Sequence, residues 1–163
     1  MGDLRGSDSG AGCRFAIVVS RFNAEITAGL LEGARGALAD AQVGPGSVAV
    51  VHVPGAFEIP VAAGRLAASG LYDAVITLGC LIKGDTMHFE YIAGAVARGI
   101  MEVSTATGIP VAFGVLTTMT DAQAEERAAP GPGNKGREAA MAAIEMATLF
   151  RQIGPRGQIG PRA

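Results

Sequence analysis

The sequence predicts an α/β fold, a three-layer α/β/α sandwich built around a four-stranded parallel sheet. Three observations lead to this prediction: short, almost continuous apolar runs alternate with longer segments of helical spacing, the runs are rich in branched side chains, and 49% of the 163 residues are hydrophobic while only 17% are charged. Strands covered by helices on both faces have this composition. Right-handed crossovers between parallel strands then place helices on both faces of the sheet.

The elements follow in chain order. The apolar runs predict strands at 15–20, 47–53, 73–79 and 110–116. Apolar residues three and four positions apart predict helices at 23–43, 58–69 and 86–107. Thr120 and Gln123 have the spacing of a capping box, which predicts a short helix, and the Pro-Gly-Pro-Gly run at 130–133 separates it from a last helix at about 134–151.

The length predicts a single domain. A chain of 163 residues is close to the roughly 150 residues of one domain with one core. We expect a flexible amino-terminal arm at 1–14, the domain at 15–151 and a tail at 152–163 that is rich in Gly, Pro and Arg. The tail contains Gln-Ile-Gly-Pro-Arg twice, and we interpret it as a disordered or loosely docked extension rather than a binding motif.

Charge and cysteine usage exclude several functions. With 13 basic and 15 acidic residues the chain has no broad positive field, so we expect neither nucleic acid nor a membrane as a partner. Cys13 and Cys80 are far apart and form no metal-binding or disulfide pattern, and the first residues lack an apolar leader, which favours the reducing cytoplasm. His52 lies inside a strand run and is expected in the core, far from His88, so no metal site is predicted.

Unusual turns follow the first three predicted strands. In a parallel sheet these turns meet at the edge formed by the carboxyl ends, where ligands bind. Phe22 and Phe57 lie in the turns and are either a platform for a flat heterocycle or covers for the sheet edge. Glu58 is either a first-turn acid stabilised by the helix dipole or an acceptor for ligand hydroxyls. The turns are residues 20–23, 54–60 and 80–88.

The start of the longest predicted helix is a candidate anion site. Thr86 is a plausible N-cap, and the free backbone N–H groups of a helix N-terminus favour a phosphate-sized anion. Arg127 and Lys135 lie on one connected segment and are candidate cations for this anion, although either could also be a solvated surface charge. His88 can give and take protons near neutral pH, which makes it the candidate proton shuttle.

Seven segments of the chain resemble the signature segments of the 6,7-dimethyl-8-ribityllumazine synthase family. They occur in the order and spacing of that family from about residue 15 to residue 150, and a joint match of seven is specific even though each alone is weak. The segments are 20–23, 55–60, 78–84, 85–91, 114–118, 126–128 and 133–136.

The resemblance implies a transferase of riboflavin biosynthesis that works without a cofactor. Such an enzyme condenses 5-amino-6-(D-ribitylamino)uracil with 3,4-dihydroxy-2-butanone 4-phosphate to 6,7-dimethyl-8-ribityllumazine, through imine formation, loss of phosphate, ring closure and dehydration. It also implies a flavodoxin-like fold that assembles as pentamers, and an association with riboflavin synthase. The compact turn between Arg127 and Lys135 resembles that of members that form shells of sixty subunits, so we expect a shell.

The resemblance also implies a role for each matching residue. His88 would be the general acid and base. Phe22 would stack on the pyrimidine, and Phe113 would reach the substrate of a neighbouring subunit. The ribityl chain would face Asn23, Ala56, Phe57 and Glu58, and the pocket would be lined by Cys80, Leu81 and Ile82. The phosphate would be held by backbone N–H groups of Asp85 and Thr86 and by the side chains of Arg127 and Lys135.

Two other functions are alternatives to this enzyme. One is a non-catalytic scaffold of the same fold that binds flavin or forms shells, although the presence of both His88 and Arg127 speaks against it. The other is a phosphorylation-dependent receiver domain, which would carry an acidic cluster after the first strand, where residues 20–23 read Ser-Arg-Phe-Asn.

Overall fold

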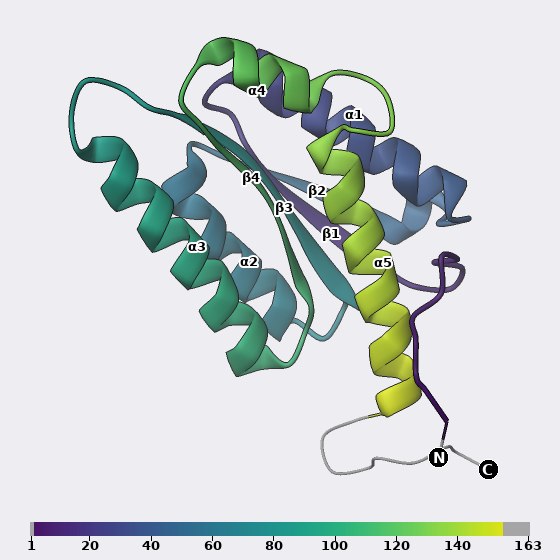
Figure 1. The fold of residues 1–163 in the computed structure, drawn as a ribbon. Helices are drawn as coiled ribbons and strands as arrows, with labels where there is room; N and C mark the ends of the chain where they lie inside the picture. Colours follow the sequence, from purple (N-terminus) through teal and green to yellow (C-terminus); the bar gives the residue numbers. More distant parts are fainter. Residues whose placement is uncertain (1, 155–163) are drawn as a thin grey trace.

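The computed structural model describes residues 2–154 and has a four-stranded parallel sheet in the order β2-β1-β3-β4 (Figure 1). The elements in chain order are β1 (Phe15–Ser20), α1 (Ala24–Asp40), η1 (Pro45–Ser47), β2 (Val48–Val53), η2 (Ala56–Glu58), α2 (Ile59–Ala68), β3 (Ala74–Ile82), α3 (His88–Thr107), β4 (Val111–Thr118), α4 (Asp121–Ala128) and α5 (Lys135–Ile153). The predicted order of strands and helices is confirmed.

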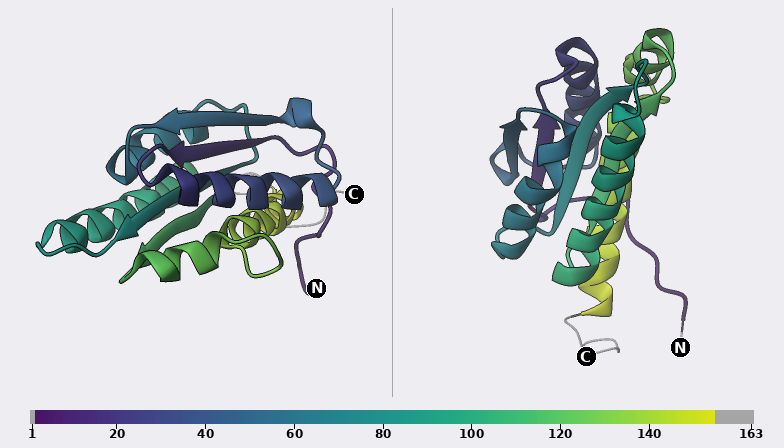
Figure 2. Two further views of the ribbon diagram at one scale, coloured as in Figure 1. Left: turned by 90° about the horizontal axis from the view of Figure 1, so that it is seen from above. Right: turned by 90° about the vertical axis from the view of Figure 1, so that its left-hand side faces the viewer.

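Helices cover both faces of the sheet, as predicted (Figures 1 and 2). One apolar cluster lies between the sheet and α1, α4 and α5, and includes Phe15, Ile17 and Leu30. A second cluster lies on the opposite face, between the sheet and α2 and α3, and includes Val18 and Ile59. Alternate residues of β1 therefore point into different clusters, which is the expected arrangement for a strand covered on both faces.

The two central strands are buried and the two outer strands are exposed in part. All residues of β1 are buried, whereas β2 is only partly buried along most of its length. The prediction that His52 lies in the core is wrong: its side chain is exposed, because β2 is the edge strand of the sheet and is only partly covered. Both β3 and β4 run past their predicted ends, since their pairing continues to Ile82 and Thr118.

Helix starts differ from the predictions by one or two residues. α1 begins at Ala24, after Asn23 in the left-handed conformation at φ 56° and ψ 53°. α3 begins at His88, and Met87, not the predicted Thr86, occupies its N-cap position. The Thr86 hydroxyl still accepts from the backbone N–H of His88, at 3.4 Å, one residue before the helix cap. At α4 the predicted cap is present, and the Thr120 hydroxyl accepts from the backbone N–H of Gln123 at 3.2 Å.

The amino-terminal arm packs along the end of α5. The backbone N–H of Ser7 donates to the Thr148 hydroxyl at 2.8 Å, and that of Gly10 donates to the carbonyl of Ala41 at 2.8 Å. Arg151 connects the same region to the sheet through an ion pair with Asp73 at 3.1 Å. α5 ends at Ile153, so the first two residues of the predicted tail are helical, while residues 155–163 lie outside the described part of the chain.

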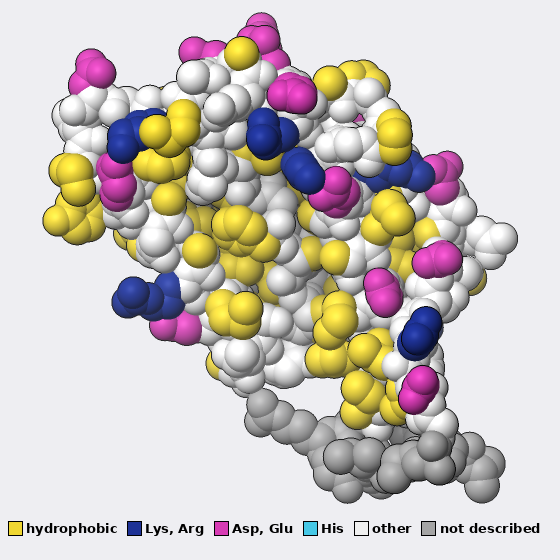
Figure 3. Space-filling model, in the orientation of Figure 1, with side chains coloured by type: hydrophobic (Ala, Val, Ile, Leu, Met, Phe, Trp, Pro, Cys, Tyr) yellow, Lys and Arg dark blue, Asp and Glu magenta, His cyan; other side chains and the backbone are white. Residues whose placement is uncertain are grey.

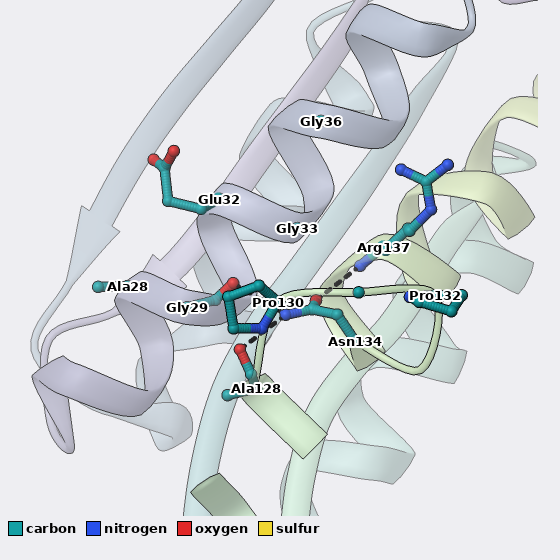
Figure 4. A pocket seen from close by; sticks show the side chains of 11 residues that line it. Ala28, Gly29, Glu32, Gly33, Gly36, Ala128, Pro130, Pro132, Asn134 and Arg137 are labelled. Atoms are coloured by element: carbon teal, nitrogen blue, oxygen red, sulfur yellow. Dashed lines mark hydrogen bonds between the residues drawn. The ribbon is translucent and has the colours of Figure 1, made fainter. Parts of the chain in front are cut away.

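Asn134 joins α1 to the turn between α4 and α5 (Figure 4). Its side chain is only 2% exposed, and its amide nitrogen donates to the carbonyls of Gly29, Ala128 and Ala129 at 2.8–3.1 Å. Its amide oxygen accepts from the backbone N–H of Arg137 at 3.0 Å, which caps α5. The polar atoms of this buried side chain are therefore all paired, and the approach of the turn to α1 is fixed.

Candidate active site

A crevice of about 590 Å³ lies at the carboxyl ends of β1, β2 and β3. The three turns that follow these strands all contribute to it, which confirms that they converge at one edge of the sheet. Of the residues predicted to bind or act on a substrate, those in the crevice are Phe22, Asn23, Ala56, Phe57, Glu58, Cys80, Leu81, Ile82, Thr86 and His88.

The two aromatic rings of the crevice are exposed. Phe22 is 69% exposed and Phe57 is 58% exposed, so neither ring is buried as a cover of the sheet edge. Exposed aromatic rings that line a cavity form a suitable surface for a flat ligand, because stacking would remove their apolar area from water. Of the two interpretations of these residues, the platform is therefore favoured.

Asn23 ties the first turn to the third. Its amide nitrogen donates to the carbonyl of Cys80 at 2.9 Å, and its left-handed backbone is a conformation that Asn adopts more readily than most residues. The bond leaves the amide oxygen of Asn23 without a protein partner among the described residues. Asn23 thus holds the crevice together with one end of its amide and offers an acceptor with the other.

Glu58 combines the two roles that the sequence left open. One carboxylate oxygen accepts from the backbone N–H of Gly55 at 3.0 Å, which closes the turn at η2. The residue is partly exposed and lines the crevice, so the other oxygen can accept a hydrogen bond from a ligand. It is both a cap of the helix start and a candidate ligand for hydroxyl groups.

Cys80 is a neutral thiol within the wall of the crevice. Its side chain is 1% exposed, and burial raises its pKa to about 11, with a smaller contribution from the negative charge of Asp121. A thiol with this pKa carries almost no thiolate at neutral pH and is a poor nucleophile. Cys80 therefore forms part of the wall of the crevice, and burial disfavours its thiolate.

The loop between β3 and α3 carries the candidate proton shuttle and the candidate anion site. His88 is the first residue of α3 and is exposed, and Thr86 precedes it in the loop. Asp85 is exposed beside them but does not line the crevice. Lys83 and Glu90 bridge the two ends of the loop with an ion pair of 2.7 Å, and this hydrogen bond lowers the pKa of Glu90. The pair holds the loop over the start of α3.

Three buried side-chain oxygens at this end of the molecule have no hydrogen-bond partner. Ser20 ends β1, Thr118 ends β4, and one carboxylate oxygen of Glu90 lies in the first turn of α3. Buried polar atoms are almost always paired, so unpaired ones are informative. All three that occur in the described residues gather around the carboxyl ends of the strands.

A second hollow of about 410 Å³ holds three of the four remaining predicted residues, all except Asp85. Phe113, Arg127 and Lys135 line it together, between β4 and the helices α4 and α5. Figure 3 shows Lys and Arg side chains mixed with Asp and Glu on the upper part of this face, and patches of apolar side chains between α3 and α5 below them. Arg127 donates to the carbonyl of Gln123 at 3.0 Å, and Lys135 pairs with Glu138 at 2.8 Å. Phe113 is 48% exposed.

One chain therefore brings together only part of the predicted site. His88 and Thr86 lie in the crevice, whereas Arg127 and Lys135 line a different hollow. The sequence analysis placed these four residues in one site and did not separate them into two groups. The two groups are separated because β4 is the outer strand and lies next to β3. Only the strand order of the sheet determines this position.

The crevice also contains residues that the sequence-based prediction missed. Phe89 and Ile92 add apolar surface from α3, and Asp121 adds a carboxylate from the start of α4. Phe89 and Ile92 could have been predicted from their spacing, because both follow His88 within the first turns of the predicted helix. Asp121 gave no such signal, since an acid after an N-cap is ordinary at a helix start.

A third hollow, of about 630 Å³, differs from the other two in its lining. It lies where the turn between α4 and α5 meets the glycines of α1, and it is lined mostly by Gly, Ala and Pro (Figure 4). Its charged residues are Glu32 and Arg137, and it contains no nucleophile and no aromatic ring. Within residues 2–154, three or more His, Cys, Asp or Glu side chains do not cluster as a metal site would require, and none of the helices is long and apolar enough to span a membrane.

A comparison with protein families agrees with this geometry. The family model described as 6,7-dimethyl-8-ribityllumazine synthase matches residues 12–151. The match includes every element of the sheet, both hollows with predicted site residues, and all five α-helices up to the last turn of α5.

Proposed function

The chain belongs to the 6,7-dimethyl-8-ribityllumazine synthase family, and from this premise we propose what the residues of the crevice and of the second hollow each do in the reaction. The enzyme is a transferase of riboflavin biosynthesis and condenses 5-amino-6-(D-ribitylamino)uracil with 3,4-dihydroxy-2-butanone 4-phosphate to 6,7-dimethyl-8-ribityllumazine. No observation favours a non-catalytic scaffold. The residues of the two hollows perform different parts of this reaction.

The pyrimidine binds in the crevice. Phe22 stacks on its ring, and the exposure of this side chain in the turn after β1 supports that role. The ribityl hydroxyls meet Asn23 and Glu58, each of which keeps an oxygen free for a ligand. Ala56 and Phe57 face the same chain, and Cys80, Leu81 and Ile82 form the wall. In this assignment the apolar surface of the crevice binds the pyrimidine, and the hydrogen-bond acceptors orient it.

The phosphate binds at the loop before α3, and His88 moves the protons. Backbone N–H groups of Asp85 and Thr86 near the positive end of the helix dipole suit a phosphate. The adjacent imidazole of His88 acts as general acid and base, taking a proton from the attacking amine and returning one as water leaves. The position of His88 in the same crevice as the pyrimidine residues supports this step.

The cations for the phosphate come from a neighbouring subunit. Arg127 and Lys135 do not line the crevice of their own chain, yet they share a hollow with the half-exposed Phe113. Placing this hollow of one chain against the crevice of the next completes the site, and Phe113 then reaches the neighbour's substrate. The observation that carries this proposal is the division of the predicted residues between two separate surfaces.

The assembly, partners and location are part of the same proposal. The patches of apolar side chains between α3 and α5 support association of copies of the chain (Figure 3), and we expect pentamers that combine into a shell of sixty subunits. Association with riboflavin synthase would pass the product on. The two free, buried cysteines fit the reducing cytoplasm.

Complementation between inactive subunits tests the shared site. His88→Ala and Arg127→Ala chains are made separately and also co-expressed, and lumazine formation is followed by its fluorescence. Each variant alone should be nearly inactive, whereas random mixing leaves about one quarter of the sites with both native residues. The mixed sample should therefore recover about a quarter of the native activity.

A matched control uses two residues assigned to the same chain. Co-expressed His88→Ala and Phe22→Ala chains should recover nothing, because every crevice then carries one defect. Recovery in this control, or none in the first mixture, would contradict the shared site. Light scattering decides the assembly: a mass of one chain contradicts the shared site, and a mass of five chains contradicts the shell.

A further inference from the structure

Asp121 is a carboxylate in the crevice to which neither the family match nor the proposed division of the reaction gives a role. It is the first residue of α4 and enters the crevice from the side of β4, next to the wall formed by Cys80. Its charge is close enough to raise the pKa of the Cys80 thiol, although burial is the larger cause. The carboxylate therefore acts on the interior of the crevice and not only on the surrounding solvent.

The carboxylate of Asp121 is free to bind a ligand. Among the described residues it forms neither a hydrogen bond nor an ion pair. Two other polar side chains of the crevice are partly occupied, since Glu58 accepts from Gly55 and the amide nitrogen of Asn23 donates to Cys80. Asp121 thus offers two oxygens where its neighbours offer one.

The chemistry of an ionised carboxylate determines what it can bind. It accepts hydrogen bonds and donates none, so it pairs with N–H and O–H groups and repels a phosphate. Both substrates carry hydroxyl groups, but only the pyrimidine carries amine and ring N–H donors, and the other carries a phosphate that the carboxylate repels. The crevice has no lysine or arginine of its own to compete for the acceptor.

We propose that Asp121 accepts a hydrogen bond from an N–H or O–H group of the ribitylaminopyrimidine and contributes to the selection of this substrate. The proposal rests on the assignment of the crevice to the pyrimidine. It assigns Asp121 no part in binding the butanone phosphate. A loss of the carboxylate should therefore weaken the binding of one substrate and leave the other unchanged.

Calorimetric titration of the pyrimidine alone, without the second substrate, tests the proposal in the absence of turnover. Asp121→Ala should raise the Kd about tenfold, because a hydrogen bond to a charged group is lost, and Asp121→Asn should raise it less because one acceptor oxygen remains. In steady-state assays, KM for the butanone phosphate should change by less than about twofold.

Glu125→Gln is the matched control. This residue is exposed one turn further along α4, does not line the crevice, and loses the same charge when substituted. If Asp121 only stabilises the start of α4, Asp121→Ala lowers the unfolding temperature and has the same Kd as Glu125→Gln, and the proposal is overturned. Failure of the native protein to bind the pyrimidine would instead contradict the assignment of the crevice itself.

Discussion

The crevice at the strand ends and the junction between α1 and the α4–α5 turn are hollows of similar volume that differ in how their polar groups are paired. At the junction, about 630 Å³, the buried Asn134 has each polar atom paired. Around the crevice, about 590 Å³, exposed aromatic rings lie beside an unpaired carboxylate, and buried oxygens of Ser20 and Glu90 lack partners. Volume does not distinguish the two regions, but satisfaction of polar groups does.

The comparison indicates which of the two regions maintains the fold and which is available to ligands. The junction has paired polar atoms and glycines in close contact, so changes there should affect stability. The crevice keeps groups free of protein partners, so changes there should affect ligands. The comparison would be contradicted if changes at the junction affected ligand binding and changes in the crevice affected stability.

The largest expected effect is at Gly136, on the structural side. A Cβ at this position would overlap the carbonyl oxygen of Leu30 in α1, and neither backbone can give way without moving a helix. Gly136→Ala should therefore lower the free energy of unfolding by about 4 kcal/mol, measured by urea denaturation. Gly44→Ala is the control, because a Cβ there meets open space; an equal loss in both variants would refute the packing argument.

The second largest loss of stability is expected at Asn134. Asn134→Ala removes the hydrogen bonds to three carbonyls and should cost about 3 kcal/mol. Gly33→Ala should also destabilise, because its Cβ would overlap the Asn134 amide. Once Asn134 is truncated this overlap is gone, so the double variant should lose less than the sum of the two single losses. Strict additivity would show that the two residues are not in contact.

On the functional side, His88→Ala should reduce kcat about a hundredfold, equivalent to about 2.7 kcal/mol of transition-state stabilisation. The side chain is exposed, so the unfolding temperature should hardly change. Activity is measured by lumazine fluorescence and stability by calorimetry on the same sample. A loss of stability with unchanged kcat would show that His88 has a structural and not a catalytic role.

The ion pair between Lys83 and Glu90 should give a smaller, pH-dependent effect. The hydrogen bond from Lys83 lowers the pKa of Glu90 in the folded state, so its stabilisation is present above the ordinary pKa of glutamate, about 4.3, and is lost as the pH falls through the lowered value. Unfolding temperatures of the native protein and Glu90→Gln should therefore differ at pH 7 and converge in acid. A difference that grows in acid would contradict the assignment.

The smallest effect is expected at Arg151, which joins α5 to Asp73 and to the carbonyl of Gly12. This ion pair is partly exposed and screened by solvent, so Arg151→Met should cost about 1 kcal/mol or less. The loss should shrink at high salt, which thermal melts at two salt concentrations would measure. A loss independent of salt would point to packing of the side chain and not to its charge.

Much of the fold was predictable because the strands are marked by apolar runs. β1 was predicted to the residue, and Thr120 caps α4 as predicted, although the Gln123 side chain accepts from the backbone N–H of Met119 and not from that of Thr120. The position of a strand within the sheet was not predictable, because a valine-rich run looks the same at the edge as in the centre. His52 was therefore expected in the core and is exposed on β2.

Of the candidate site, the sequence predicted that the turns converge but not how the candidate residues are arranged around them. The convergence of the three turns followed from parallel topology, and the crevice confirms it. The separation of Arg127 and Lys135 from His88 follows from β4 lying at the sheet edge, which residue types do not encode. Asp121 was missed because a helix-start acid looks alike whether it faces solvent or a ligand.

The two buried cysteines have a practical consequence. Cys13 and Cys80 are each 1% exposed, and burial raises the pKa of both thiols. A maleimide dye at neutral pH should therefore leave the native chain almost unlabelled, while a cysteine introduced on an exposed turn would react at once. The molecule is thus ready for site-directed fluorescence labelling without first removing its own thiols.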